Sequence, residues 1–128
     1  MSFSDYAEAA ILDHVFGKSA MAQPQTYLGL TTEDPGEAGA VTEPSGGDYA
    51  RVEVLPSGWV RSGNTVTTSA TVSFPEATAP WGTVTHFVIC DAPTGGNVLM
   101  YAPLDEPKAV SENDILRFVD GSITITLD

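Results

Sequence analysis

The spacing of apolar residues changes near residue 25, from a helical period to an alternating one. In the segment SFSDYAEAAILDHVFG, residues 2–17, apolar side chains recur at helical spacing along one stripe. The stripe consists of Ala7, Ile11 and Val15, with Leu12 and Phe16 beside them. This pattern predicts an amphipathic helix whose apolar stripe has to be buried against another surface.

The ends of this helix carry recognisable capping residues. Asp5 is predicted as the N-cap, because Glu8 follows three residues later in a variant of the capping box. Both acids also complement the positive end of the helix dipole. Gly17 fits the left-handed position just after the last turn, and Lys18 lies near the negative end. The helix is therefore expected within residues 1–18.

Beyond residue 25 the period is two, which is typical of strands. Strands are predicted at Thr26–Thr31, Tyr49–Leu55, Val66–Phe74, Thr83–Asp91, Val98–Leu104, Asp114–Val119 and Ser122–Asp128. Strict alternation in SITITLD, residues 122–128, indicates one buried and one solvated face. THFVIC, residues 85–90, is apolar on both faces, which favours a central strand covered on both sides.

Turn-forming residues separate these segments, and Asp120-Gly121 is the strongest hairpin signal among them. About seven short strands at turn-marked spacing predict a mainly β protein, an antiparallel β-sandwich that is jelly-roll-like or a small barrel, with one N-terminal amphipathic α-helix. We expect a single domain over residues 1–128, with the sandwich at 25–128. The loop at 32–48 exceeds the usual length of a connection, so it is expected to be exposed or to bind.

The charge of the chain restricts its partners. Seventeen acidic residues against five basic ones give a formal net charge of −12. The few bases are scattered, whereas nucleic-acid binding needs clustered cations, so we expect no nucleic-acid partner. Anionic membrane surfaces are disfavoured for the same reason. Asp5 and Glu8 also stand where a secretory signal carries basic residues, so no such signal is expected.

His86 and Cys90 are the first candidates for chemistry. On a strand, positions four apart lie ~13 Å from each other, whereas a nucleophile and its base need about 3 Å. A structural role is therefore predicted for both, with Cys90 as a buried thiol. Gly17-Lys18-Ser19 matches only the end of a phosphate loop and lies after a helix rather than after a strand, so we do not interpret it as one.

Acidic residues crowd the long loop. They are Glu33, Asp34, Glu37, Glu43 and Asp48. Calcium binding or paired carboxylates for glycoside cleavage could use such a set, but the spacing of a calcium loop is absent. We therefore predict no metal, no cofactor and no catalytic residues, and treat these acids as an exposed recognition loop. The aromatic residues Trp59, Trp81, Tyr49 and Tyr101 could line a sugar-binding platform, but core packing is the favoured interpretation, with Trp81 closing one end of the sandwich.

Three blocks of this sequence resemble a family of small tailed-bacteriophage virion proteins. They are the Asp-Tyr-Ala-Glu helix that ends in residues 12–17, LDHVFG; the strand YLGL at residues 27–30; and the strand WGTVTHF at residues 81–87. Members carry labels such as tail fibre, head fibre or decoration protein. The resemblance covers nearly the whole chain. It implies a non-enzymatic virion structural protein that is assembled in the host bacterial cytoplasm.

Two functions follow from this resemblance. The first is a capsid decoration or cement subunit that associates with the major capsid protein and forms a homo-oligomer, for which a trimer would fit. Its expected assembly interface is Phe3, Tyr6, Ile11, Val15 and Phe16. The alternative is a tail-fibre or tail-tip subunit that associates with tail proteins and contacts the host through the 32–48 loop. A hydrolase acting on surface sugars is a weaker third hypothesis.

Overall fold

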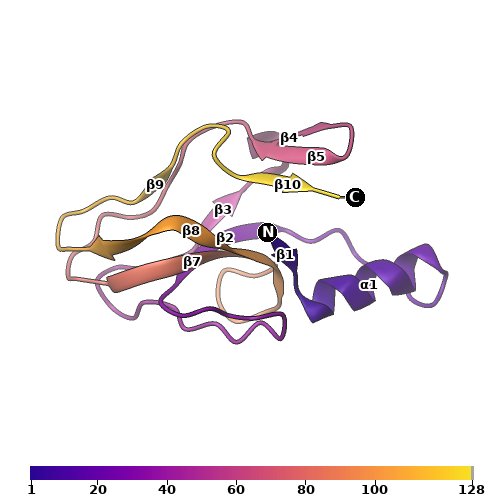
Figure 1. Ribbon diagram of the computed structural model, residues 1–128, viewed down its shortest axis with the longest axis horizontal. Coiled ribbons are helices and arrows are strands. Elements are labelled where there is room, and N and C mark those ends of the chain that lie inside the picture. Colours follow the sequence, from indigo (N-terminus) through magenta and orange to yellow (C-terminus); the bar gives the residue numbers. More distant parts are fainter. Residues whose placement is uncertain (128) are drawn as a thin grey trace.

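The computed structural model describes residues 1–127, which form one helix and three antiparallel sheets (Figure 1). The strands are β1 (Ser2–Phe3), β2 (Thr26–Thr31), β3 (Val52–Val54), β4 (Trp59–Ser62), β5 (Thr65–Thr68), β6 (Val72–Ser73), β7 (Gly82–Cys90), β8 (Val98–Val110), β9 (Arg117–Phe118) and β10 (Thr124–Thr126). The helix α1 is Asp5–Val15, and a short 3-10 turn, η1, is Pro56–Gly58. No helix among the described residues has the length and apolar character needed to cross a bilayer.

The largest sheet has the strand order β1-β8-β7-β2-β3, and β7 is its central strand. Phe87 and Ile89 of β7 belong to the main core on one face. Val88 and Cys90 point to the other face, where they pack with Val41 of the 32–48 loop. This arrangement confirms the prediction of a central strand covered on both sides. It also shows that the long loop covers one face of the large sheet.

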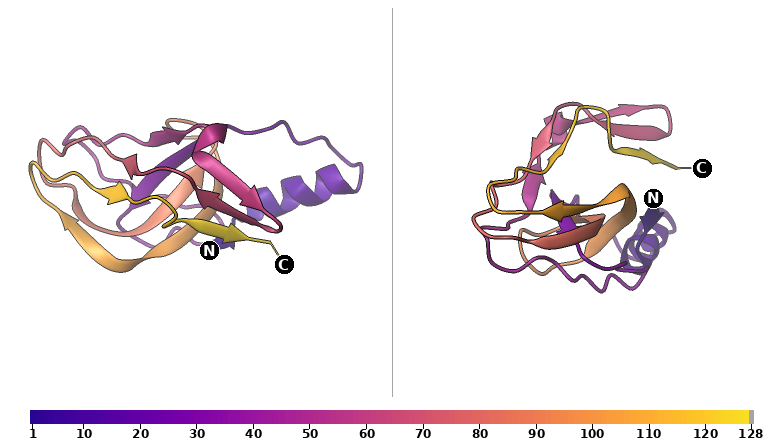
Figure 2. Two further views of the ribbon diagram at one scale, coloured as in Figure 1. Left: turned by 90° about the horizontal axis from the view of Figure 1, so that it is seen from above. Right: turned by 60° about the vertical axis from the view of Figure 1, so that its left-hand side comes forward.

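Two smaller sheets, β10-β5-β4 and β6-β9, form the layer opposite the large sheet (Figures 1 and 2). The core between the layers contains Leu28, Leu30, Phe74, Trp81, Val84, Ile89, Leu99 and Ile123, all of them buried. The structure is thus mainly β and antiparallel with one N-terminal helix, as predicted, and it is sandwich-like. The described strands do not close into a barrel.

Aromatic side chains fill one end of this sandwich. The ring of Tyr49 lies edge-on to that of Trp81, with centroids 5.3 Å apart, and stacks at 6.3 Å from Phe74. Phe118 packs against both Phe74 and Phe87. Such edge-to-face and offset contacts stabilise aromatic cores beyond their buried area. Trp81 is buried within this aromatic cluster, in agreement with the expected core role.

The start of the helix differs from the prediction. Ser4, not Asp5, is the N-cap: its Oγ accepts a hydrogen bond of 3.1 Å from the amide of Ala7. Asp5 and Glu8 lie in the first turn, where their charges still complement the dipole. Residues 2–3 are not helical, because they pair with β8 as strand β1. Gly17 has φ +72°, as expected for the residue after the helix.

The Asp120-Gly121 hairpin prediction is wrong. Gly121 has φ +78° and the chain does turn there, but β9 pairs with β6 and β10 pairs with β5. The turn therefore carries the chain from one small sheet to another. Turn chemistry determines a local reversal, whereas the partner of each strand is decided by side chains far away in the sequence.

Several strand limits also differ from the prediction. The segment predicted as one strand at 66–74 divides into β5 and β6, and β4 was not predicted. Strand β8 continues to Val110 through Pro103 and Pro107. These prolines are tolerated because β1 pairs only with Met100 and Tyr101, so that the later part of β8 is a sheet edge on that side.

Candidate interaction surface

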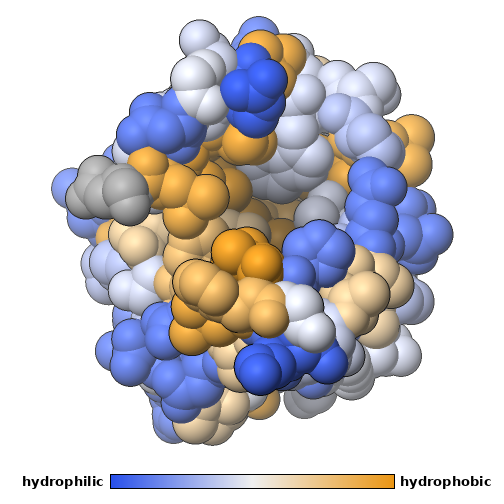
Figure 3. Space-filling view, turned by 90° about the vertical axis from the view of Figure 1, so that its right-hand side faces the viewer, coloured by the Kyte–Doolittle hydropathy of each residue, from blue (hydrophilic) through white to orange (hydrophobic). Residues whose placement is uncertain are grey.

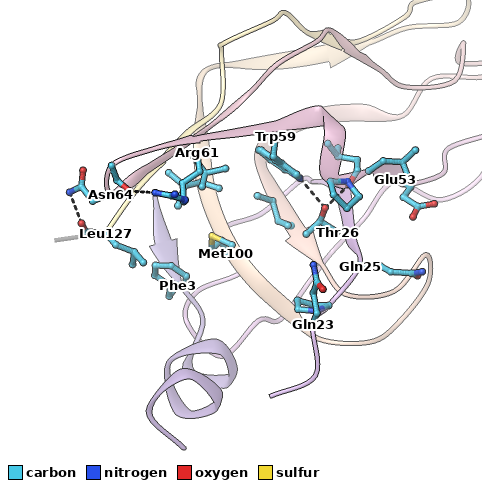
Figure 4. Close-up of a pocket in the computed structure, with 18 residues that line it drawn as sticks. Phe3, Gln23, Gln25, Thr26, Glu53, Trp59, Arg61, Asn64, Met100 and Leu127 are labelled. Atoms are coloured by element: carbon cyan, nitrogen blue, oxygen red, sulfur yellow. Dashed lines mark hydrogen bonds between the residues drawn. The ribbon is translucent and has the colours of Figure 1, made fainter. Parts of the chain in front are cut away.

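An apolar groove opens at the end of the sandwich opposite the aromatic residues. Its volume is about 760 Å³, and it lies between the three-stranded sheet and the large sheet, all five strands of which contribute to its lining. Its apolar lining includes Phe3, Val54, Trp59, Val66, Met100 and Ile125. Figure 4 shows Trp59 on one side of the groove, with Phe3 and Met100 on the other. The two layers therefore separate here without side chains of this chain filling the space.

Two polar groups beside the groove, the indole of Trp59 and the hydroxyl of Thr26, are already paired within the chain. The indole Nε1 of Trp59 donates a hydrogen bond of 3.0 Å to the hydroxyl of Thr26. That hydroxyl in turn donates to the carbonyl oxygen of Val54 at 2.7 Å. Because these two groups need no further partner, this part of the groove is suited to apolar side chains.

Arg61 of β4 places a positive charge at the rim of this groove (Figure 4). Its guanidinium donates to the carbonyl oxygen of Gly63 at 2.9 Å. Within residues 1–127, no carboxylate forms an ion pair with Arg61; the described ion pairs involve Arg51 and His86. The charge is therefore available to a negatively charged group of a partner.

A second apolar surface lies on α1, which projects from the body of the molecule (Figure 1). Only Ala7 of this helix is buried. Large apolar residues near its C-terminal end, including the C-cap Phe16, are exposed: Ile11 by 37%, Leu12 by 58%, Val15 by 65% and Phe16 by 70%. We call Ile11, Leu12, Val15 and Phe16 the helix stripe. The predicted stripe is therefore present, but its own chain does not cover it.

The start of α1 is held firmly although its end is free. The Ser4 hydroxyl donates to the carbonyl oxygen of Val98, and the Ser4 amide donates to that of Leu99 at 3.0 Å. The amide of Asp5 donates to the carbonyl oxygen of Glu37 in the long loop at 2.8 Å. The direction of the helix is thus determined by backbone contacts near residue 4, while residues 11–20 are all exposed.

The five residues expected at an assembly interface lie in three places: the helix stripe, the groove and a second hollow. Ile11, Val15 and Phe16 belong to the exposed helix stripe. Tyr6 is 45% exposed on the same helix, but lines a different hollow beside the 19–25 segment. Phe3 is partly buried and lines the groove. Sequence reasoning did not find the groove, because its lining comes from separate strands and carries no motif.

The acidic loop is ordered by contacts with the sheets. Glu43 accepts a hydrogen bond of 2.6 Å from the Arg51 guanidinium, whose side chain is only 5% exposed. Glu43 also accepts a hydrogen bond of 2.5 Å from the hydroxyl of Tyr49. Burial, together with this hydrogen bond, raises the pKa of Tyr49 above its ordinary value. Glu43 therefore ties the loop to the sheet and is not free for recognition.

The other four acids of the predicted loop, Glu33, Asp34, Glu37 and Asp48, are exposed. Asp34 accepts a hydrogen bond from the amide of Gly36 at 2.9 Å, and its other oxygen lies 3.9 Å from Nε2 of His86. Among residues 1–127, no group of three or more acidic, histidine or cysteine side chains is placed to hold a metal ion. The exposed acids thus form a negatively charged surface.

His86 and Cys90 lie on the single strand β7, so their predicted separation holds. Nδ1 of His86 lies 2.8 Å from the Thr85 hydroxyl. Cys90 is fully buried, and burial raises the pKa of its thiol to about 11. The thiol is therefore protonated at neutral pH, whereas a nucleophilic cysteine needs a thiolate.

The four aromatic residues considered as a sugar platform do not come together. Trp81 and Tyr49 pack in the core, and Trp81 donates a hydrogen bond to Gly47. Trp59 lines the groove. Tyr101 packs against the buried residues Val88, Cys90 and Val98 on the face of the large sheet that the long loop covers. Three of these rings are thus structural, and only Trp59 borders an open surface.

Comparison with known proteins supplies the family. A family model described as "Podophage GP4 fiber I protein gp80" matches residues 2–126, almost the whole chain. No curated protein matches this sequence. The match agrees with the resemblance seen in the helix and in the strands at 27–30 and 81–87, and it points to a structural role in a virion. The chain therefore belongs to the podophage GP4 fiber I protein gp80 family, a family of phage virion structural proteins of the fibre type.

Proposed function

We propose that this chain is a fibre subunit on the tail of a podophage virion. The observation that carries the proposal is the family match across residues 2–126, whose description names a fibre protein. The structure is compatible with this role, since it combines an antiparallel β body with apolar surfaces that its own chain leaves uncovered. Large exposed apolar surfaces on a folded protein are typical of contacts with other proteins.

In this proposal two regions of the molecule have different tasks. The apolar side with the helix stripe and the groove attaches the subunit to other virion proteins, including further copies of itself. The 32–48 loop, with exposed Glu33, Asp34, Glu37 and Asp48, faces outward and meets the host surface. Ordered loops on a rigid sheet are well suited to recognition, because little conformational entropy is lost when they bind.

The experiment that tests this function is the location of the chain in an intact particle. A cryo-EM map of the virion, together with the stoichiometry of stained protein bands, is expected to place the chain at the tail in low copy number. Replacing the exposed part of the loop by a Gly-Ser segment of equal length is expected to leave particles intact and to reduce adsorption to host cells. Density for the chain only on the capsid would contradict the proposal.

A capsid decoration subunit is the second candidate, because the exposed helix stripe would also fit an anchor on a protein shell. This function predicts a copy number that matches the icosahedral lattice and positions at its symmetry axes. The same map and the same gel distinguish it from the fibre. Host adsorption would then not depend on the loop.

A further inference from the structure

The helix stripe and the groove are complementary surfaces of one chain. The stripe presents four apolar side chains on a projecting helix, and the groove presents an apolar lining without side chains to fill it. An 11-residue helix is marginal in water unless tertiary contacts support it, yet only Ala7 is buried on its own chain. Both surfaces thus expose apolar area that contact with a partner would remove from water.

Both features also lie on the same side of the molecule. Figure 3 views the side toward which α1 projects in Figure 1, and it shows a hollow with apolar residues around it. The exposed end of α1, residues 11–16, stands clear of its own sheets, so it is able to enter a neighbouring molecule without separation of its own sandwich. The hydrogen bonds of Ser4 hold the helix in this projecting direction.

The geometry points to a second copy of this chain as the occupant: the helix stripe of one copy binds in the groove of the next. This inference rests on the proposed function in that a fibre subunit occurs in several copies. The stripe and the groove are different surfaces of the chain. A closed assembly therefore forms in one of two ways: two copies each insert a helix into the other's groove, or several copies form a ring in which each helix enters the next groove. Each copy then makes two such contacts, which doubles the apolar area buried per subunit.

Charge complementarity supports the same occupant. Glu8 is exposed on α1, one turn before Ile11 and Leu12 and on the same side of the helix. When the Phe16 end of the stripe lies innermost, Glu8 remains at the mouth of the neighbour's groove, where Arg61 lies on the rim. An ion pair between them would specify the direction in which the helix enters rather than contribute most of the affinity.

Sedimentation velocity on the full chain, at concentrations up to about 1 mM, tests the contact, since a Kd in this range is then visible. The wild-type chain is expected to associate reversibly. Leu55, just after β3, also lines the groove. The stripe variant Leu12→Glu/Val15→Glu and the groove variant Leu55→Glu are each expected to raise the Kd at least tenfold, which corresponds to about 1.4 kcal/mol. All three residues are exposed, so the variants should fold, which circular dichroism would verify.

Val60→Glu is the matched control. Val60 is 54% exposed on β4, next to Trp59 and Arg61, but it does not line the groove, because alternate residues of a strand face opposite sides. Its substitution adds the same charge to the same sheet and is expected to leave the Kd within about twofold, as for surface positions outside an interface. An equal loss of association in Val60→Glu would mean that added negative charge alone separates the copies, and it would overturn the inference.

Mixing the two interface variants distinguishes this contact from a symmetric one. A stripe variant still has an intact groove, and a groove variant still has an intact helix, so the mixture is expected to associate more strongly than either variant alone. A helix-to-helix contact would not recover in this way. Glu8→Arg and Arg61→Glu are each expected to weaken association, and their combination in one chain is expected to restore it.

Three further results would overturn the inference. They are a wild-type chain that stays monomeric throughout, variants without effect, and a mixture that does not recover. A chain that is monomeric in solution but present at the tail of the virion would refute this contact and leave the fibre function intact, with another virion protein as the occupant of the groove. A chain that associates as described but is absent from particles would refute the function and leave the contact standing.

Discussion

The indole nitrogen of Trp81 donates a hydrogen bond of 2.8 Å to the carbonyl oxygen of Gly47, which joins the end of the long loop to the core. The contact is close because Gly47 has no side chain. Its φ is +60°, and a Cβ built there would lie 2.7 Å from the carbonyl oxygen of Ala79 and 2.8 Å from the Trp81 ring. A glycine is therefore required at this position for two separate reasons.

Gly47→Ala is accordingly expected to destabilise the protein by about 2–5 kcal/mol, the sum of about 1–2 for the left-handed backbone and about 1–3 for the collision. Gly46→Ala is the matched control, since Gly46 has φ +75° but nothing within 4 Å of its Cβ. Gly46→Ala should therefore lose only the stability that corresponds to the left-handed backbone, about 1–2 kcal/mol. Urea unfolding followed by tryptophan fluorescence measures both, and equal losses would contradict the proposed collision.

Ser4 determines both the start of α1 and its attachment to β8. Ser4→Ala removes the cap to Ala7 and the hydrogen bond to Val98, and it is expected to cost about 1–3 kcal/mol. Hydrogen exchange of the amides in the first turn of α1 should accelerate more than exchange in β7. Ser2→Ala, at an exposed position of β1, serves as the control and should change stability by less than about 0.5 kcal/mol.

Glu43 balances the charge of the nearly buried Arg51 guanidinium. Glu43→Gln keeps the shape of the side chain but removes its charge, so we expect a loss of about 1.5–3 kcal/mol in the free energy of unfolding. The 32–48 loop should also become more sensitive to limited proteolysis, since Glu43 ties it to the sheet. Glu33→Gln, on the exposed part of the same loop, should change neither property. Equal behaviour of the two variants would show that the ion pair does not hold the loop.

Because the Cys90 thiol is buried, the free energy of unfolding is expected to vary with pH in the alkaline range. Its pKa is raised by burial from 9.0 to about 11, so between these values the unfolded chain releases a proton that the folded chain keeps. Stability from this group is therefore fully present below pH 9 and falls as the pH rises toward 11. The hydroxyl of Tyr49, whose pKa is also raised, acts in the same direction at higher pH.

Urea unfolding between pH 8 and pH 11 measures this loss. The free energy of unfolding is expected to fall with pH by up to about 1.4 kcal/mol per pH unit for each group involved. Cys90→Ala lowers stability overall because it leaves a small cavity, but its slope between pH 9 and pH 11 should be shallower than that of the wild type. Identical slopes would mean that Cys90 is not responsible. In the folded wild type at neutral pH, the thiol should also react with a thiol reagent only as fast as the protein opens.

Local patterns in the sequence were sufficient to predict the elements whose cause is local. The helix follows from apolar residues at helical spacing between an acidic start and Gly17, and the double-sided character of β7 follows from THFVIC. The distance between His86 and Cys90 also follows from strand geometry alone. Even here the N-cap was misplaced by one residue, because Ser4 gains a second hydrogen bond to Val98 that only the folded sheet provides.

Other features depended on contacts between distant parts of the chain. Asp120-Gly121 predicted a turn, but the partners of β9 and β10 lie some fifty residues earlier, at Val72–Ser73 and Thr65–Thr68. The sequence by itself determined which residues are apolar and with what period. Only the tertiary structure decided which of those surfaces are covered, because burial depends on the whole set of neighbours. It left the helix stripe and the groove exposed, and these are the surfaces on which assembly is proposed.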